Sequence, residues 1–329
     1  VLGLDIGGTK LAAGVVAGNG TVRSFVTCPT RVEEGPASGL KRLFALGRDA
    51  LGAAGLDPDT AAGRLAGCGI GCGGPLDSTA GVLLAPPHLP GWLDIPITQL
   101  AYAAYGLTAV LDNDGTAAAA GEWRFGAGRG TRHLVYLTVS TGVGGGVVLD
   151  GRTFRGAAGN GGEPGHVTVR SDGRPCRGCG RTGCLEAYAS GTSIAERARE
   201  AIASDPRGSV LARIPDPGPT SADVARAALD GDPLATALWD ETTDLLAEGL
   251  ASIVNLYEPE LVVLGGGVTR AGEQLLGPVR EKTARLAMGP AAAAARIVRA
   301  RAGDHAGVVG AAAVALERLV DNAVPLPTA

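Results

Sequence analysis

The chain opens with Val1-Leu-Gly-Leu-Asp5-Ile-Gly-Gly-Thr-Lys10, in which a strand-like apolar run ends in a polar glycine turn, and a second strand-like run follows at 11–16. The same pattern returns about 130 residues later: Leu134-Val-Tyr-Leu-Thr-Val139 leads into the turn Ser140-Thr-Gly-Val-Gly-Gly-Gly146, and a return strand is predicted at 147–149. Asn19-Gly20 and Asp150-Gly151 supply the next turn of each copy. This repeat predicts a duplicated α/β fold.

Length and composition limit the classes of protein to consider. The 329 residues are enough for about two domains, and 45% apolar residues exclude wholesale disorder. The formal net charge of −4 argues against a general nucleic-acid or membrane-surface binder. No apolar run reaches the roughly 18 residues needed to span a bilayer. We therefore expect a cytoplasmic protein without a nucleic-acid or membrane partner.

Apolar periodicity predicts the remaining elements. Helices are expected at 39–54, 191–203, 221–229, 234–256 and 308–319, and buried strands at 65–70 and 261–264. The tail at 324–329, with two prolines, is expected to be frayed.

The two glycine turns indicate phosphate binding, because glycine lets backbone amides approach phosphate oxygens and a nearby carboxylate can hold Mg²⁺ through water. The alternative is a pair of purely structural glycine-rich hairpins. Neither turn is a P-loop. A third stretch, Gly69-Ile-Gly-Cys-Gly-Gly74, matches a dinucleotide fingerprint, but Pro75 follows at once, so we expect no helix there to receive a pyrophosphate.

Three polar residues, Asp112-Asn113-Asp114, follow a strand-like run and precede an alanine-rich helical stretch. Helix capping explains one of them. All three together stand at the carboxyl end of a strand, where α/β folds bind ligands. Capping and ligand binding both remain open from spacing alone.

Four soft ligands lie within nineteen residues: His166, Cys176, Cys179 and Cys184. This is the number needed for a closed tetrahedral zinc site, so a structural Zn²⁺ is predicted, the alternative being a chance cluster of reduced thiols. The other cysteines, Cys28, Cys68 and Cys72, are expected to be small buried apolar residues.

These motifs together resemble the ROK family of sugar kinases and repressors, over nearly the whole chain. The matching stretches are the two glycine turns, Asn113-Asp114, Gly162-Glu163-Pro-Gly-His166 and 261–268. The most specific match is Cys179-Gly-Arg-Thr-Gly-Cys184-Leu-Glu186-Ala-Tyr-Ala-Ser-Gly191, which follows the family signature C-G-x-x-G-C-x-E-x-Y-A-S-G.

The resemblance implies an actin-like (duplicated ribonuclease H-like) two-domain α/β kinase. The small domain would be residues 1–112 plus the C-terminal helix 307–329, and the large domain 113–306, with the sugar between them and ATP beside it. The implied reaction is ATP- and Mg²⁺-dependent phosphorylation of a hexose, favouring glucose at its 6-hydroxyl. A homodimer is the family expectation.

The resemblance also implies roles for particular residues. Asp114 would take the proton of the reacting hydroxyl. The sugar ligands would be Gly74, Pro75, Asn113, Glu163, His166 and Glu186. The nucleotide and its Mg²⁺ would be bound by Asp5, Gly7, Gly8, Thr9, Lys10, Thr141, Gly142, Gly265, Gly266 and Gly267.

Two departures from the family pattern matter. The spacing Cys176-x2-Cys179 replaces the usual C-x-C, and we expect Gly178 to absorb the extra residue. His88 replaces the Asn of the family's N-L-P-G-W loop, which leaves fructose, allose, mannose or an N-acetylhexosamine open as substrates.

Two other classes of function are weaker. A sugar-sensing regulator would carry a DNA-binding extension before the first phosphate motif or lack the catalytic carboxylate, whereas here that motif starts at residue 5. An actin-like or chaperone ATPase without a sugar would not need the glutamate, histidine and cysteine motifs.

Overall fold

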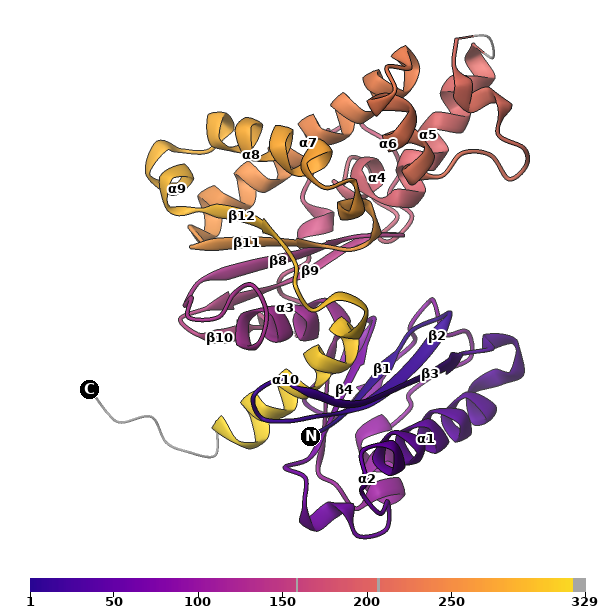
Figure 1. The fold of residues 1–329 in the computed structure, drawn as a ribbon, viewed down its shortest axis with the longest axis vertical. Helices are drawn as coiled ribbons and strands as arrows, with labels where there is room; N and C mark the ends of the chain where they lie inside the picture. The colour runs from indigo at the N-terminus through magenta and orange to yellow at the C-terminus, as the bar shows by residue number, and fades with distance from the viewer. Residues whose placement is uncertain (158, 206–207, 322–329) are drawn as a thin grey trace. The chain divides into compact units, whose positions relative to one another are not determined.

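The computed structural model describes residues 1–157, 159–205 and 208–321, and they form two compact units (Figure 1). The first unit contains Val1–Gly130, Gly146–Gly162 and the segment that starts at Arg301. The second contains Thr131–Gly145 and Glu163–Ala300.

The sheet of the first unit has five strands in the order β3-β2-β1-β4-β7. They are β1 (Leu2–Ile6), β2 (Lys10–Val16), β3 (Val22–Pro29), β4 (Cys68–Cys72) and β7 (Ala109–Asn113). β2 is antiparallel to β1 and β3, and β4 is parallel to β1 and β7.

The second five-stranded sheet repeats this order as β10-β9-β8-β11-β12. Its strands are β8 (Leu134–Val139), β9 (Val143–Leu149), β10 (Arg152–Phe154), β11 (Leu261–Gly265) and β12 (Arg296–Arg299). β10 is antiparallel to β9, and β11 is parallel to β8 and β12. The chain passes from the second unit to the first within β9. The predicted duplication is confirmed.

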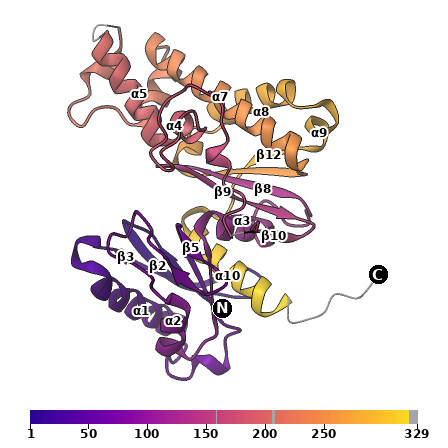
Figure 2. The ribbon, with the colours of Figure 1, turned by 180° about the vertical axis from the view of Figure 1, so that it is seen from behind.

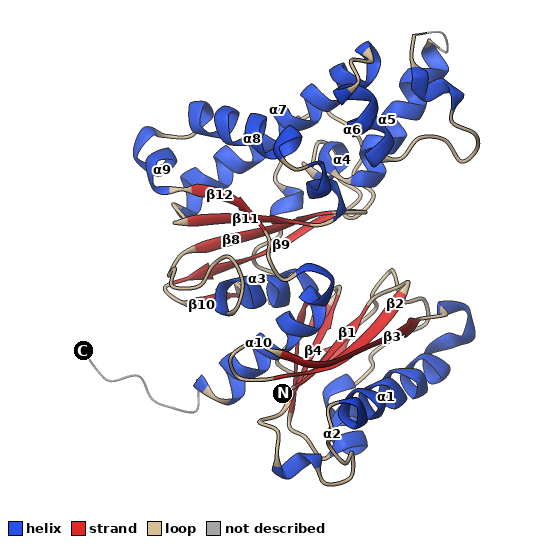
Figure 3. Ribbon diagram, viewed as in Figure 1, coloured by secondary structure: helices blue, strands red, loops and turns tan. Residues whose placement is uncertain are grey.

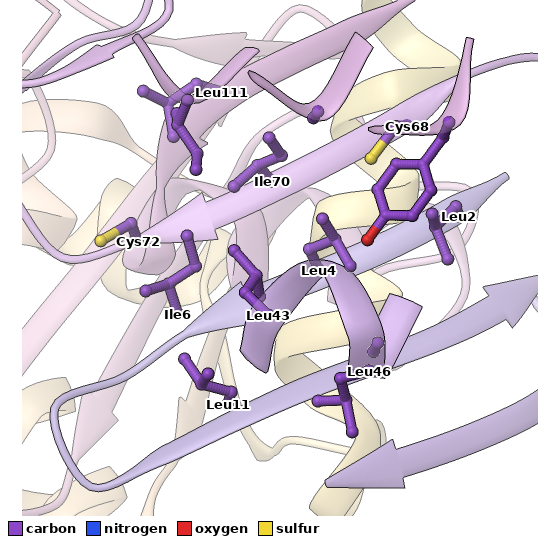
Figure 4. Close-up of a cluster of buried hydrophobic side chains, with 14 of the residues drawn as sticks. Leu2, Leu4, Ile6, Leu11, Leu43, Leu46, Cys68, Ile70, Cys72 and Leu111 are labelled. Atoms are coloured by element: carbon purple, nitrogen blue, oxygen red, sulfur yellow. The ribbon is translucent and has the colours of Figure 1, made fainter. Parts of the chain in front are cut away.

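Helices cover both faces of the first sheet. α1 (Gly35–Ala53) and α2 (Ile97–Tyr105) lie side by side on one face, and Figure 2 shows the same arrangement from behind. Alternate residues of β1, which are Leu2, Leu4 and Ile6, pack against Leu43 and Leu46 of α1 (Figure 4). Successive residues of a strand point to opposite faces, so these three side chains share one face of the sheet. They are buried because α1 covers that face.

The other face of this sheet carries α3 (Asp114–Arg124) and α10 (Ala306–Leu319). Here the strands present glycine to α10: a Cβ at Gly69 would lie 1.8 Å from the carbonyl oxygen of Ala311. α3 and α10 also meet through glycine, since a Cβ at Gly121 would lie 3.0 Å from the Cα of Gly310. Close backbone packing therefore ties α3 to α10 and to the first sheet.

The second unit is mostly helical beyond its strands (Figure 3). Its helices are α4 (Glu186–Ala189), α5 (Gly191–Ser204), α6 (Ser221–Leu229), α7 (Pro233–Tyr257), α8 (Glu273–Leu286) and α9 (Gly289–Ala294). The predictions at 191–203, 221–229 and 234–256 are confirmed, and so is the strand at 261–264.

Several elements differ from the sequence-based expectation. The first helix begins at Gly35 rather than residue 39, and β4 occupies Cys68–Cys72 rather than 65–70. α2, α8, α9 and β12 were not predicted. α8 contains Pro278, and β12 exposes arginine at both ends, so neither has a clear apolar period.

The first segment of the first unit ends at Gly130 and not after residue 112 as expected. The reason is that α3 packs on α10 and therefore belongs to the first unit. The expected helix 307–329 is observed as Ala306–Leu319, and residues 322–329, including the tail predicted to fray, lie outside the described residues. No described helix is long and apolar enough to cross a membrane.

Candidate functional site

Three of the predicted motifs follow one edge of the first sheet. Because β1, β4 and β7 are parallel, Ile6, Cys72 and Asn113 stand in register at their carboxyl ends. The first glycine turn, the Gly74-Pro75 segment and Asp114 come directly after these strands. β5 (Leu76–Asp77) follows Pro75, so the expectation of no helix there is confirmed.

The first glycine turn is tightly closed. The N–H of Gly7 donates to the carbonyl of Lys10 at 3.1 Å, and the hydroxyl of Thr30 donates to the carbonyl of Gly7 at 2.6 Å. A Cβ at Gly8 would lie 2.7 Å from the backbone oxygen of His88, so a side chain has no room there. Thr9 and Lys10 are exposed, which leaves them free to meet a ligand from solvent.

The structure separates the roles of the three polar residues after β7. Asp112 is fully buried, and its side chain pairs with Arg155. Asn113 is the N-cap of α3, since its Oδ1 accepts hydrogen bonds from the N–H groups of Gly115 at 2.8 Å and Thr116 at 3.4 Å. Asp114 is exposed, so its carboxylate is open to solvent.

Asn113 caps α3 through its side-chain oxygen, and the cap does not use its side-chain NH2 group. Its oxygen is used by the cap, but its Nδ2 lies 3.8 Å from the position that a Cβ of Gly74 would take. Two predicted sugar ligands, the Asn113 amide and the Gly74 backbone, are therefore neighbours.

Asp5 lies beside the first turn of α10 and near the predicted catalytic carboxylate. A Cβ at Gly307 would lie 2.2 Å from its Oδ2. Burial raises the pKa of Asp5 to about 6; the negative charge of Asp114 adds to this shift and Lys10 opposes it. Asp5 and Asp114 thus form an electrostatically coupled pair at this edge.

His88 is docked against both loops of this edge. A Cβ at Gly73 would lie 2.6 Å from its Cε1, and its Nε2 lies 3.9 Å from the thiol of Cys72. Burial lowers the pKa of His88, although Asp114 and a hydrogen bond to the backbone of Ile6 oppose the shift. The half-buried His88 ring is therefore packed inside the loop cluster rather than solvated.

The second unit brings its own two glycine motifs together. β8 and β11 are parallel, with Gly265 in register with Thr138, so Ser140–Gly142 and Gly265–Gly267 lie at the same sheet edge. A Cβ at Gly266, whose φ is 88°, would lie 2.4 Å from the carbonyl oxygen of Val139.

A cavity of about 350 Å³ opens beside these turns. Its lining includes Ser140, Thr141, Thr192, Arg199, Thr220 and Gly267. Hydroxyls and one guanidinium line the cavity together with apolar surface from Ala195, Pro217, Pro219 and Val268, a combination typical of small-molecule sites.

The Glu163–His166 segment is held against β9. A Cβ at Gly165 would lie 1.8 Å from the carbonyl oxygen of Val143, which explains the glycine of this motif. Residues Pro164–His166 form a 3-10 turn in which the N–H of His166 donates to the carbonyl of Glu163 at 3.2 Å. Glu163 is exposed.

The four predicted metal ligands converge. One donor atom from each of His166, Cys176, Cys179 and Cys184 lies within 4.8 Å of all the others. Sγ of Cys176 is 3.7 Å from Nδ1 of His166, and Sγ of Cys179 is 3.5 Å from Sγ of Cys184. Two sulfurs of a tetrahedral zinc site with arms of ~2.3 Å are about 3.8 Å apart, so the donor set fits this geometry.

Gly178 of the cysteine loop lies close to the side chains of Glu186 and His166. A Cβ there would lie 2.5 Å from Oε1 of Glu186 and 3.2 Å from Cε1 of His166. A side chain at position 178 would therefore require the Glu186 carboxylate to shift. Of the other three cysteines, Cys68 and Cys72 are fully buried as expected, and burial raises the pKa of both. Cys28 is only partly buried, contrary to the expectation.

Some contributors were not identified from the sequence. Arg199 and Thr220 line the cavity beside the glycine motifs of the second unit, and neither was singled out from the sequence. Arg155, which pairs with Asp112, was not singled out. Its only sequence signal was its position just before the glycine-rich segment that leads to Glu163.

A model of the ROK family matches residues 1–318. The chain is 36% identical over 322 residues to a glucokinase of Thermotoga maritima, covering 97% of this chain and 98% of the relative. It is 35% identical over 315 residues to an N-acetylmannosamine kinase of Shigella flexneri, covering 96% of this chain and 98% of the relative.

A crystal structure of a ROK family glucokinase from Streptomyces griseus, in complex with glucose and AMPPNP, has a TM-score of 0.78 and 34% identity to this chain. The match covers 96% of this chain and 99% of that one. The expected actin-like α/β fold is therefore confirmed.

Proposed function

The chain belongs to the ROK family, and we propose that it is an ATP-dependent hexose kinase that phosphorylates glucose on the 6-hydroxyl. The observation that carries the proposal is the exposed Asp114 carboxylate, which follows a parallel strand next to the Asn113 cap and the Gly74 turn. The relatedness to glucokinases over nearly the full length supports glucose as the substrate.

Asp114 would act as the general base. A sugar hydroxyl is too weak an acid to ionise beforehand, so a carboxylate has to orient it and accept its proton as the phosphoryl group transfers. The Oδ1 of Asp114 accepts a hydrogen bond from the N–H of Gly115 at 2.8 Å, which fixes the side chain while the carboxylate remains exposed.

The first glycine turn would bind the transferring phosphate. Gly7 and Gly8 present backbone, and Thr9 and Lys10 add an exposed hydroxyl and ammonium. Asp5 would hold Mg²⁺ through water; the ion, when bound, neutralises charge on the phosphoryl oxygens.

The cavity beside the glycine motifs of the second unit would hold the nucleoside end of ATP. Thr141 and Gly142 would meet a phosphate, and Gly265, Gly266 and Gly267 would let the backbone approach the nucleoside. The cavity volume of about 350 Å³ is at the lower end of small-ligand sites.

The hexose hydroxyls would be recognised by the Asn113 amide, the Gly74-Pro75 backbone and the side chains of Glu163, His166 and Glu186. Carboxylates accept and an imidazole N–H donates, which suits neighbouring hydroxyls of a pyranose.

Zinc would be the resident structural metal, with His166 and the three clustered cysteines as ligands. The contact of His166 Nδ1 with Cys176 supports this role and leaves Nε2 as the nitrogen for the sugar. Four protein ligands leave no open position, so the metal would supply order to the loop rather than chemistry.

An N-acetylhexosamine is the second candidate substrate. It is favoured by the 35% identity over 315 residues to an N-acetylmannosamine kinase. A homodimer in the cytoplasm remains the expectation for the assembly and its compartment.

The test is a coupled assay of ADP release with glucose, mannose, fructose, allose, N-acetylglucosamine and N-acetylmannosamine. Glucose should give the highest kcat/KM. A tenfold preference for another sugar, about 1.4 kcal/mol of transition-state discrimination, would overturn glucose and keep the kinase class. No ADP release with any of these sugars would overturn the hexose kinase proposal itself.

A further inference from the structure

We infer that Arg155 is a positioning residue: it holds Asp112 and, through Asp112, the Asn113–Asp114 turn in its reactive arrangement. This inference rests on the proposed kinase function, because it concerns the same carboxylate. Every residue in it belongs to the first unit.

The contact between Arg155 and Asp112 is close and lies inside the fold. Nε of Arg155 donates to Oδ2 of Asp112 at 2.8 Å. Nη2 also lies 2.8 Å from this oxygen, at an angle that makes it an ion-pair contact rather than a hydrogen bond. The Asp112 side chain is 1% exposed and that of Arg155 24% exposed.

Asp112 passes this constraint on to the backbone that carries Asp114. Its other oxygen, Oδ1, accepts a hydrogen bond from the N–H of Asn113 at 3.0 Å. Asn113 then caps α3, and Asp114 is the first residue of that helix. Two oxygens of one buried carboxylate therefore connect Arg155 to the turn that presents Asp114.

Arg155 is itself held in place. It approaches Oε2 of Glu317 at 3.6 Å, and Glu317 accepts hydrogen bonds from the N–H and hydroxyl of Thr153 at 3.0 and 2.9 Å. Arg318, the next residue of α10, donates to the carbonyl of Leu111 in β7 at 3.0 Å. Arg318 of α10 and Arg155, which follows β10, therefore both bind β7 next to the turn that carries Asp114.

Stability alone gives a weak reason for this arrangement. Burying an ion pair gains little net free energy, because the desolvation of both charges offsets their attraction. Burial raises the pKa of Asp112, and Arg155 counters that rise. The ion pair can instead serve to fix the position of the adjacent Asn113–Asp114 turn. Such precision matters for a catalytic group, because its misplacement by ~1 Å can lower the rate by about 10²-fold.

The experiment is a double-mutant cycle on Asp112→Asn and Arg155→Met, with kcat and the KM for glucose measured for each variant. Arg155→Met should lower kcat by about 10- to 100-fold and change KM less than about threefold. The double variant should lose no more kcat than the worse single variant, because both changes break the same link. Arg155→Lys should restore part of the loss, since it keeps the charge without the planar fork.

Arg124→Met is the matched control. Arg124 pairs with Asp321 at the other end of α3, and its side chain is 24% exposed, like that of Arg155, whereas Asp321 is 44% exposed. The substitution therefore removes an equally exposed arginine, in a more exposed ion pair, away from Asp114. It should leave kcat within about twofold of wild type.

Three results would overturn the inference: wild-type kcat in Arg155→Met, losses that add in the double variant, or an equal loss in Arg124→Met. If Arg155→Met does not fold, the test uses Asp112→Asn and Arg155→Lys instead. Wild-type kcat in both of these variants would overturn the inference that Arg155 is a positioning residue. An active wild type with an inactive Asp114→Asn variant would keep the proposed function even then. An inactive wild type would overturn both.

Discussion

Oε2 of Glu186 accepts a hydrogen bond from the backbone N–H of Val143 at 2.9 Å. Glu186 begins α4 directly after the cysteine loop. Val143 begins β9 inside the predicted glycine turn 140–146, because the return strand starts at residue 143 and not at 147 as expected. The other carboxylate oxygen of Glu186, Oε1, lies 3.2 Å from the thiol of Cys176. One carboxylate therefore connects the predicted metal loop to the predicted phosphate turn within the second unit.

Glu186→Gln should weaken sugar binding. The amide oxygen can still accept from Val143, but the charge-assisted acceptor for a sugar hydroxyl is lost, and such bonds contribute ~1.5–3 kcal/mol. We expect the Kd for glucose, measured by calorimetry, to rise by about tenfold or more. An unchanged Kd would show that Glu186 only links the two loops.

Asp114→Asn should abolish turnover while preserving the pocket. The amide keeps the shape but cannot accept the proton, so kcat should fall by ~10² or more. The Kd for glucose should change much less. A variant with more than about a tenth of wild-type kcat would exclude Asp114 as the general base.

Purified protein should contain about one zinc per chain, and Cys179→Ser should lose metal and glucose affinity together. The reason is that the loop from Cys176 to Cys184 leads directly into Glu186. Elemental analysis and calorimetry measure the two effects. Cys28→Ser, a change at a thiol outside the cluster, should retain both. Active enzyme without zinc would contradict the structural-metal prediction.

The carboxyl group of Asp5 should titrate near pH 6 in the nucleotide-free protein, as its raised pKa of about 6 indicates. Asp114→Asn should lower this pKa, because it removes the neighbouring negative charge. Carbon-detected NMR of the carboxyl group measures both, and Asp59→Asn, at an exposed site, is the control. An Asp5 pKa that Asp114→Asn leaves in place would show that the two carboxylates are not coupled.

The same shift has a consequence for stability. The folded state binds the Asp5 proton more tightly than the unfolded chain, whose Asp pKa is about 3.9. This contribution to the free energy of unfolding should therefore fall as pH rises from about 4 to about 6. Asp5→Asn should remove that part of the pH dependence in denaturant titrations.

His88→Asn should leave sugar preference largely unchanged. The ring hydrogen-bonds the Ile6 backbone and packs on Gly73, so we expect it to shape the loops rather than to bind a hydroxyl. The ratio of kcat/KM for glucose and mannose should change less than about threefold. A tenfold change in that ratio would identify His88 as a direct determinant of specificity.

The amino-acid sequence alone predicted the repeated strand–turn–strand pattern, and it identified the glycine turns and the cluster of one histidine and three cysteines. Each of these is a local signal, since glycine, cysteine and alternating apolar residues act within a few positions of one another. For the same reason the helices at 221–229 and 234–256 were predicted almost to the residue, whereas α8, with Pro278 and a weak apolar period, was missed.

The tertiary structure decided what the local signals left open. Asp112, Asn113 and Asp114 are three adjacent polar residues that the sequence does not distinguish. The tertiary structure assigns Asp112 to a buried ion pair with Arg155, Asn113 to the cap of α3 and Asp114 to the exposed surface. His88 could have been solvated, and only its contact with Gly73 shows that it is not. Both outcomes depend on residues more than ten positions apart in the chain, whose approach is set by strand register and close backbone packing rather than by any local preference.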